Sequence, residues 1–123
     1  MVKYCGYLLG EDWLLQRALE IGIEPPETGG DYLQTIALAS RNARHVTGVY
    51  AYTRFRRVKT SKGKIFWCIA FASDDPREGI ATSRPPEEKY KALQELLQRN
   101  GPPGWYRGAW SATFSCYSER KTN

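Results

Sequence analysis

The chain has 123 residues, of which 41% are hydrophobic, and it carries a net charge of +5. This length corresponds to a single domain, and the apolar fraction is enough for a modest core, which argues against a disordered chain. No apolar run is long enough to span a membrane, and the first residues lack the apolar segment of a secretory signal peptide. We therefore expect an intracellular protein, in the cytoplasm or the nucleus, with no membrane partner.

The three cysteines are Cys5, Cys68 and Cys116, and their odd number prevents all of them from pairing within one chain. They show neither a Cys-x-x-Cys pair nor the spacing of a zinc site, and the single histidine is His45. We predict reduced thiols without a disulfide inside the chain, and we predict no metal and no cofactor.

The charges are distributed unevenly along the chain. Residues 1–31 hold six acids and two bases, residues 32–73 hold eight bases and no acid, and residues 74–123 hold eight bases and seven acids. A basic segment next to an acidic one gives a polarised surface, which attracts anionic partners and also favours contacts between copies of the chain.

The N-terminal part predicts a first helix after an ambiguous segment. Residues 2–9 fit either a short strand or the approach to a helix. Asp12 is placed to cap a helix whose apolar stripe runs as far as Gly22. Residues 24–30 are rich in proline and glycine and predict a loop.

A second helix is predicted from Tyr32. Asp31 and Gln34 have the spacing of a capping box, and the helix should end near residues 43–45. Arg41 and Arg44 in the last turn suit the negative end of the helix dipole, so part of the positive charge has a structural explanation.

The strongest pattern lies in residues 45–73 and predicts two strands joined by a basic turn. The first arm alternates with period two, as a half-buried strand does. Its outward side holds two tyrosines and two arginines: Tyr50, Tyr52, Arg54 and Arg56. The second arm, residues 65–72, is apolar on both faces, which is typical of a central strand. Gly63 suits a turn with positive φ. Three lysines keep this turn in water: Lys59, Lys62 and Lys64.

The remaining chain predicts a turn at residues 74–79, a third helix that starts at Pro85 and Pro86, and a last strand at residues 108–117. The predicted fold is therefore α+β, with three helices packed on an antiparallel sheet of three or four strands in one domain.

The core prediction follows from the apolar second arm of the hairpin, which needs a cover of helix. Trp67 and Phe71 should be buried against Leu93 and Leu97 of the third helix.

The hairpin is the main candidate for a binding surface. Nucleic acids are bound by cations that contact phosphates and by flat side chains that stack on bases. The candidate site comprises seven residues: Tyr50, Tyr52, Arg54, Arg56, Lys59, Lys62 and Lys64. The alternative is that the two tyrosines pack under a helix while the arginines extend into water.

Other constellations give weaker signals. The carboxylates of Asp74, Asp75 and Glu78 follow a buried strand and have the ligand type for Mg²⁺, although Asp-Asp-Pro is also ordinary turn chemistry. A pair of His45 with Cys68 or Cys116 would require the fold to join them. The aromatic loop at residues 102–106 would either line a small pocket or cover the core.

We therefore expect a small binding protein whose basic, aromatic hairpin contacts a polyanion, in particular single-stranded nucleic acid. The alternative is a protein–protein or self-association module, for example a homodimer, without catalytic activity. A small metal-dependent or cysteine-based enzyme comes third, and no catalytic residue is predicted.

Overall fold

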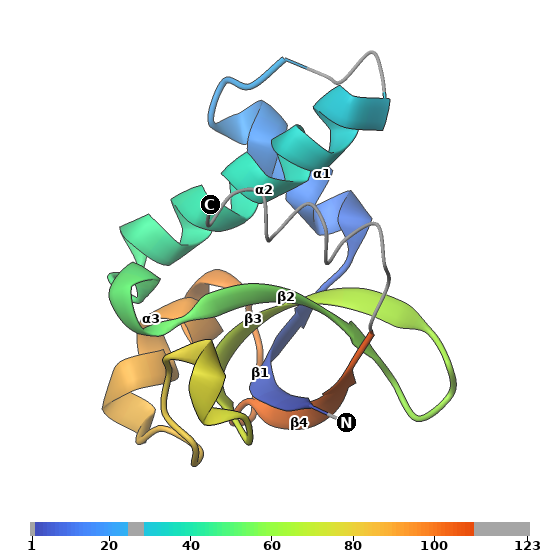
Figure 1. The fold of residues 1–123 in the computed structure, drawn as a ribbon. Coiled ribbons are helices and arrows are strands. Elements are labelled where there is room, and N and C mark those ends of the chain that lie inside the picture. Colours follow the sequence, from blue (N-terminus) through green and yellow to red (C-terminus); the bar gives the residue numbers. More distant parts are fainter. Residues whose placement is uncertain (1, 25–28, 110–123) are drawn as a thin grey trace.

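The computed structural model describes residues 2–24 and 29–109, with side chains from residue 32 onward in the second range. Its elements in chain order are β1 (Lys3–Leu9), α1 (Glu11–Glu20), α2 (Gly29–Val46), the 3₁₀ helix η1 (Tyr50–Tyr52), β2 (Arg54–Lys59), β3 (Ile65–Ser73), the 3₁₀ helix η2 (Pro76–Glu78), α3 (Glu87–Leu96) and β4 (Gly104–Gly108). The predicted α+β fold, with three helices and an antiparallel sheet, is confirmed for the described part of the chain (Figure 1).

The four strands form a small closed barrel in the order β1-β3-β2-β4, and all neighbours are antiparallel. β3 lies between β1 and β2, which confirms the prediction of a central strand from its apolar faces. β1 approaches β3 closely at a bulge between Cys5 and Gly6, where a Cβ on Gly6 would clash with the Ile69 carbonyl oxygen. This packing requires glycine at that position.

Apolar side chains form two clusters, one on each side of the strands. The larger cluster joins β1 and β3 to all three helices, which cover the barrel from outside (Figure 1). It contains Trp67, Phe71, Leu93 and Leu97, all of them buried, so the core prediction is confirmed. The smaller cluster fills the barrel and includes Cys68.

The helix starts differ from the predictions at two of three places. α1 begins at Glu11 with Gly10 as its N-cap, so Asp12 lies inside the first turn. α2 begins at Gly29, two residues before the predicted cap at Asp31. The third helix begins directly after Pro86, as predicted.

The first arm of the hairpin is shorter than predicted, because β2 begins only at Arg54. Tyr50 and Tyr52 lie in η1, so the prediction that they share a strand face with Arg54 and Arg56 is wrong. Thr53 stabilises the turn of η1, because its hydroxyl donates a hydrogen bond to the Val49 carbonyl at 2.8 Å.

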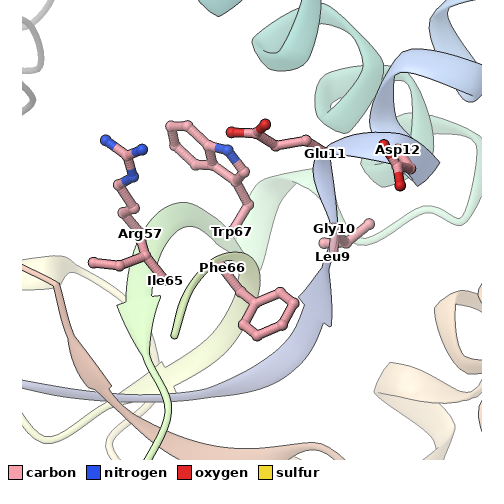
Figure 2. Close-up of a pocket in the computed structure, with 8 residues that line it drawn as sticks. All are labelled: Leu9, Gly10, Glu11, Asp12, Arg57, Ile65, Phe66 and Trp67. Atoms are coloured by element: carbon pink, nitrogen blue, oxygen red, sulfur yellow. The ribbon is translucent and has the colours of Figure 1, made fainter. Parts of the chain in front are cut away.

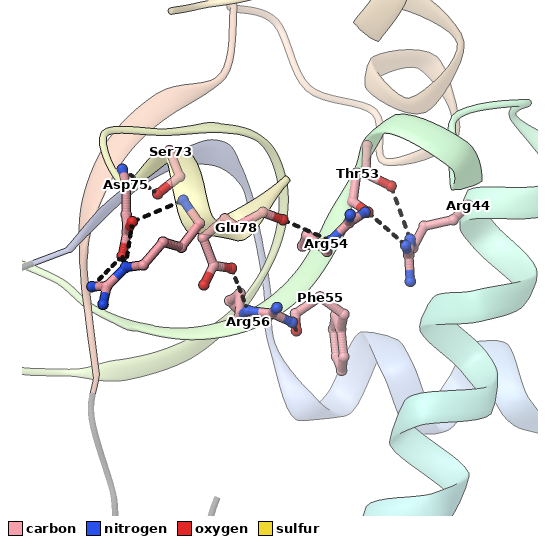
Figure 3. Close-up of polar contacts among 9 residues, drawn as sticks. Arg44, Thr53, Arg54, Phe55, Arg56, Ser73, Asp75 and Glu78 are labelled. Carbon is pink, nitrogen blue, oxygen red and sulfur yellow. Dashed lines mark hydrogen bonds and ion pairs between the residues drawn. The ribbon is translucent and has the colours of Figure 1, made fainter. Parts of the chain in front are cut away.

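Arg44 of α2 holds the same turn from outside. Its guanidinium donates to the Tyr50 carbonyl oxygen at 3.2 Å. It also donates to the Thr53 carbonyl oxygen at 2.7 Å and to the Thr53 hydroxyl at 2.9 Å (Figure 3). These side-chain bonds satisfy backbone groups that a strand would have paired with a neighbour.

The last described strand, β4, lies N-terminal to the strand predicted at residues 108–117. Most of that predicted strand lies outside the described residues. Within the described residues, no helix combines the length and the apolar character needed to cross a membrane.

Candidate nucleic-acid interface

The tip of the β2–β3 hairpin holds three exposed lysines on a turn with defined hydrogen bonds. The amide of Thr60 donates to the Lys64 carbonyl at 2.8 Å, and the amide of Gly63 donates to the Thr60 carbonyl at 2.9 Å. Gly63 has a φ of 86°, as its place in the turn predicts. The lysines are Lys59, Lys62 and Lys64, and none of them forms an ion pair with another residue in the described ranges.

The two predicted arginines are bound to another part of the protein, the loop that contains η2. Arg54 donates to the Glu78 carbonyl at 3.1 Å, and Arg56 forms an ion pair with the Glu78 carboxylate at 2.8 Å (Figure 3). Burial raises the pKa of the neighbouring Tyr4 phenol to about 12; the Glu78 charge adds to this rise and the Arg56 charge opposes it. These arginines therefore belong to an internal polar network.

The two predicted tyrosines have different surroundings. The Tyr52 hydroxyl donates to the Lys89 carbonyl at 2.9 Å, and its ring packs near Phe71. Tyr50 is 37% exposed, but its ring stacks on His45 at 4.1 Å, and the Arg44 guanidinium lies 4.4 Å from its centre. Tyr52 is therefore packed against α3, as the alternative interpretation expected. The Tyr50 ring is already in contact with His45 and Arg44, so a base that approached it would have to share the ring with them.

A pocket of about 400 Å³ lies between the start of α1 and the part of the hairpin next to its tip, and the sequence interpretation missed it (Figure 2). Its lining residues are Leu9, Gly10, Glu11, Asp12, Arg57, Ile65, Phe66 and Trp67. Alternation along β2 could have placed Arg57 on the same side as Lys59, opposite to Arg54 and Arg56. No local sequence pattern predicts that residues 9–12 lie next to the hairpin and line this pocket.

The aromatic wall of the pocket is fixed by stacking. The ring of Phe55 stacks on Trp67 at 4.8 Å and 9°, and the Arg57 guanidinium lies 5.1 Å from the centre of the Trp67 ring. Trp67 is only 4% exposed, and the Phe66 ring points to the opposite face of β3, where it packs on the smaller cluster (Figure 2). The accessible apolar surface beside Trp67 therefore comes mainly from Ile65, which is 50% exposed.

The acidic side of the pocket is formed by the first turn of α1. The Tyr32 hydroxyl of α2 donates a hydrogen bond to the Glu11 carboxylate, which orients it. Burial raises the pKa of Tyr32 to about 12; the hydrogen bond and charge of Glu11 add to this rise, whereas the Arg57 charge lowers it. The pocket thus has an anionic side and a cationic side.

The carboxylates that follow β3 have other partners. Asp74 accepts the Lys3 amide at 2.9 Å, and Asp75 pairs with Arg77 at 2.9 Å, while Glu78 holds Arg56. Across residues 2–24 and 29–109, no three His, Cys, Asp or Glu side chains are grouped to hold a metal ion.

The cysteine–histidine pair considered as a weaker signal does not form between Cys68 and His45. Cys68 is enclosed in the barrel, where burial strongly raises the pKa of its thiol, and His45 is exposed at the end of α2. Cys5 and Cys68 are both free thiols, and Cys116 lies outside the described residues.

The prediction of an aromatic loop at residues 102–106 is wrong for its second half, because Trp105 and Tyr106 lie in β4 and pair with Cys5 and Tyr4 of β1. Tyr106 packs on the cluster inside the barrel, whereas Trp105 is 38% exposed. Neither residue lines the pocket near the hairpin.

Comparison of the chain with protein-family models, with curated proteins and with solved structures finds no match.

Proposed function

We propose that this protein binds single-stranded nucleic acid with the tip of the β2–β3 hairpin. The observation that supports the proposal is the group of three exposed lysines on a hydrogen-bonded turn, next to a pocket with an aromatic wall and the cationic Arg57. The mutual repulsion of these cations contributes nothing to folding, whereas phosphates would neutralise it and release counterions.

The proposed contact surface is therefore displaced along the hairpin from the seven residues that the sequence predicts. Its cations are Arg57, Lys59, Lys62 and Lys64. We assign Arg54 and Arg56 to the support of the hairpin, because both bind Glu78. Tyr52 belongs to the packing of η1 against α3, and Tyr50 lies with it at the far end of β2 from the lysines.

The test is fluorescence anisotropy with labelled RNA and DNA oligomers at two salt concentrations. Affinity should fall as salt rises, with a slope that loses about 0.7 for each phosphate contact removed from a single strand. Lys62→Glu should weaken binding and flatten the slope.

Lys91→Glu is the matched control, because Lys91 is an exposed lysine on α3 and its reversal changes the net charge equally. Equal losses in both variants would mean that only the overall charge attracts the oligomer, and the hairpin proposal would be wrong. Absence of binding by the wild-type protein at low salt would reject nucleic-acid binding and favour an interaction module.

A further inference from the structure

The pocket offers two opposed kinds of hydrogen-bonding group. The Glu11 carboxylate and the Arg57 guanidinium lie on opposite sides of the Trp67 ring (Figure 2). An ionised carboxylate only accepts hydrogen bonds, and a guanidinium only donates them. A ligand that fits must therefore present donors on one edge and acceptors on another.

The pocket also has room above the backbone of Gly10. A Cβ on this residue would meet no atom within 4 Å, and its φ of −80° is available to any amino acid. The volume of about 400 Å³ lies within the range of roughly 300–1,000 Å³ that is usual for small-molecule sites.

The pocket and the lysines are adjacent along the hairpin. Arg57 pairs with Trp67 across the strands, and Lys59 pairs with Ile65, so the lysines begin where the pocket ends. A strand whose phosphates contact the tip could therefore place one base in the pocket.

Guanine is the standard base that fits this arrangement. Its N1–H and N2–H groups are neighbouring donors, which match the two oxygens of one carboxylate. Its O6 and N7 atoms are neighbouring acceptors, which arginine contacts in a bidentate manner. Adenine and uracil place an acceptor next to the donor on their pairing edge, so a carboxylate would be repelled there.

We propose that this pocket binds a single unpaired guanine base, with Glu11 accepting from its N1–H and N2–H edge and Arg57 donating to its O6 and N7 edge. Ile65, which is 50% exposed, provides the apolar contact, and Tyr32 positions Glu11. The proposal rests on the proposed function, because the lysines of the hairpin hold the strand to which the base belongs.

The test compares labelled oligouridine tracts that carry one central guanosine, inosine, adenosine or cytidine at constant salt. Guanosine should bind about tenfold more tightly than adenosine or cytidine, the order expected for a bidentate contact. Inosine lacks only the N2 amino group, so it should lose a large part of this preference. A tract with 7-deazaguanosine tests the contact between N7 and Arg57 in the same way.

Two variants test the pocket itself. Glu11→Gln keeps an acceptor for Tyr32 but replaces one of the two acceptor oxygens, so the guanosine preference should disappear while the affinity for oligouridine stays unchanged. Gly10→Leu should have the same effect by filling the pocket. Glu20→Gln at the other end of α1 is the control for loss of one charge, and it should leave the preference intact.

The outcomes separate this inference from the proposed function. Binding that weakens with salt but is equal for all four tracts would leave nucleic-acid binding standing and overturn the guanine pocket. A guanosine preference that survives in both Glu11→Gln and Gly10→Leu would also overturn it. If no tract binds at low salt, the proposed function fails, and the pocket proposal fails with it.

Discussion

Trp67 connects the barrel, the helices and the pocket through one side chain. Its indole stacks on Phe55 of β2 and belongs to the cluster shared with the helices. Trp67 also lines the pocket. Truncation would remove this packing and leave a cavity that the surrounding strands cannot close completely.

Trp67→Ala should lower the free energy of unfolding by about 3–5 kcal/mol, the usual range for truncation of a large buried aromatic residue. Denaturant unfolding followed by circular dichroism measures the change. Trp105→Ala is the matched control, since Trp105 is 38% exposed, and its loss should stay below about 1 kcal/mol. Similar losses for both tryptophans would contradict this account of the core.

At the scale of elements, the network around Glu78 ties η2 to β2. Glu78 accepts from Arg56 through its carboxylate and from Arg54 through its carbonyl, and the Arg56 and Glu78 side chains are only partly exposed. Bonds to charged groups in such a setting contribute more to stability than an exposed surface pair does.

Arg56→Ala should therefore lower the free energy of unfolding by about 1–3 kcal/mol, because the Glu78 carboxylate loses its partner. The salt slope of oligomer binding should remain that of the wild type, because Arg56 is occupied inside the protein. Denaturant unfolding and the anisotropy titration measure the two quantities. If the variant were as stable as the wild type and its salt slope were flatter, Arg56 would contact the oligomer and this account of Arg56 would be wrong.

The elements that the sequence predicts well are those determined by local patterns. The two apolar faces of residues 65–72 specify β3, and Pro85 and Pro86 mark the start of α3. The 3₁₀ helix η1 was not predictable in this way, because Arg44 fixes its backbone through hydrogen bonds from another element. Alternation describes which side a residue faces, but it does not report such bonds.

The pocket escaped prediction for a related reason. It forms because β1 pairs with β3 in a register that places Leu9 opposite Trp67, and this brings the start of α1 to the hairpin. That register depends on contacts between distant segments, including the close approach at Gly6. The lysines of the turn were predictable because their exposure and their neighbours are both local.

At the scale of the whole molecule, the acidic and basic segments meet within one chain. Glu11 and Asp12 come from the segment with six acids, and Arg57 comes from the segment with no acid, yet all three line one pocket. The polarised surface expected from the sequence therefore has a boundary at this pocket. Charges of both signs there favour a ligand with defined donors and acceptors over a uniform polyanion.

The seam that closes the barrel is short, and it lies under the proposed binding surface. β2 and β4 are joined by the pairs of Val58 with Gly108 and of Lys59 with Arg107, next to a bond from the Ala109 amide to the Arg57 carbonyl at 2.8 Å. Lys59 and Arg107 are direct cross-strand neighbours of like charge, which weakens this seam.

A phosphate bound between Lys59 and Arg107 would attract both cations and offset their repulsion, so the ligand should stabilise the pairing of β2 with β4. Amide hydrogens of residues 104–109 should then exchange with deuterium more slowly when an oligomer is bound, because local opening of the seam would cost the binding energy as well. Amides in the centre of β3 provide the reference, since their exchange requires opening of the barrel on both sides. Unchanged exchange in β4 at saturating oligomer would show that the ligand binds away from this seam.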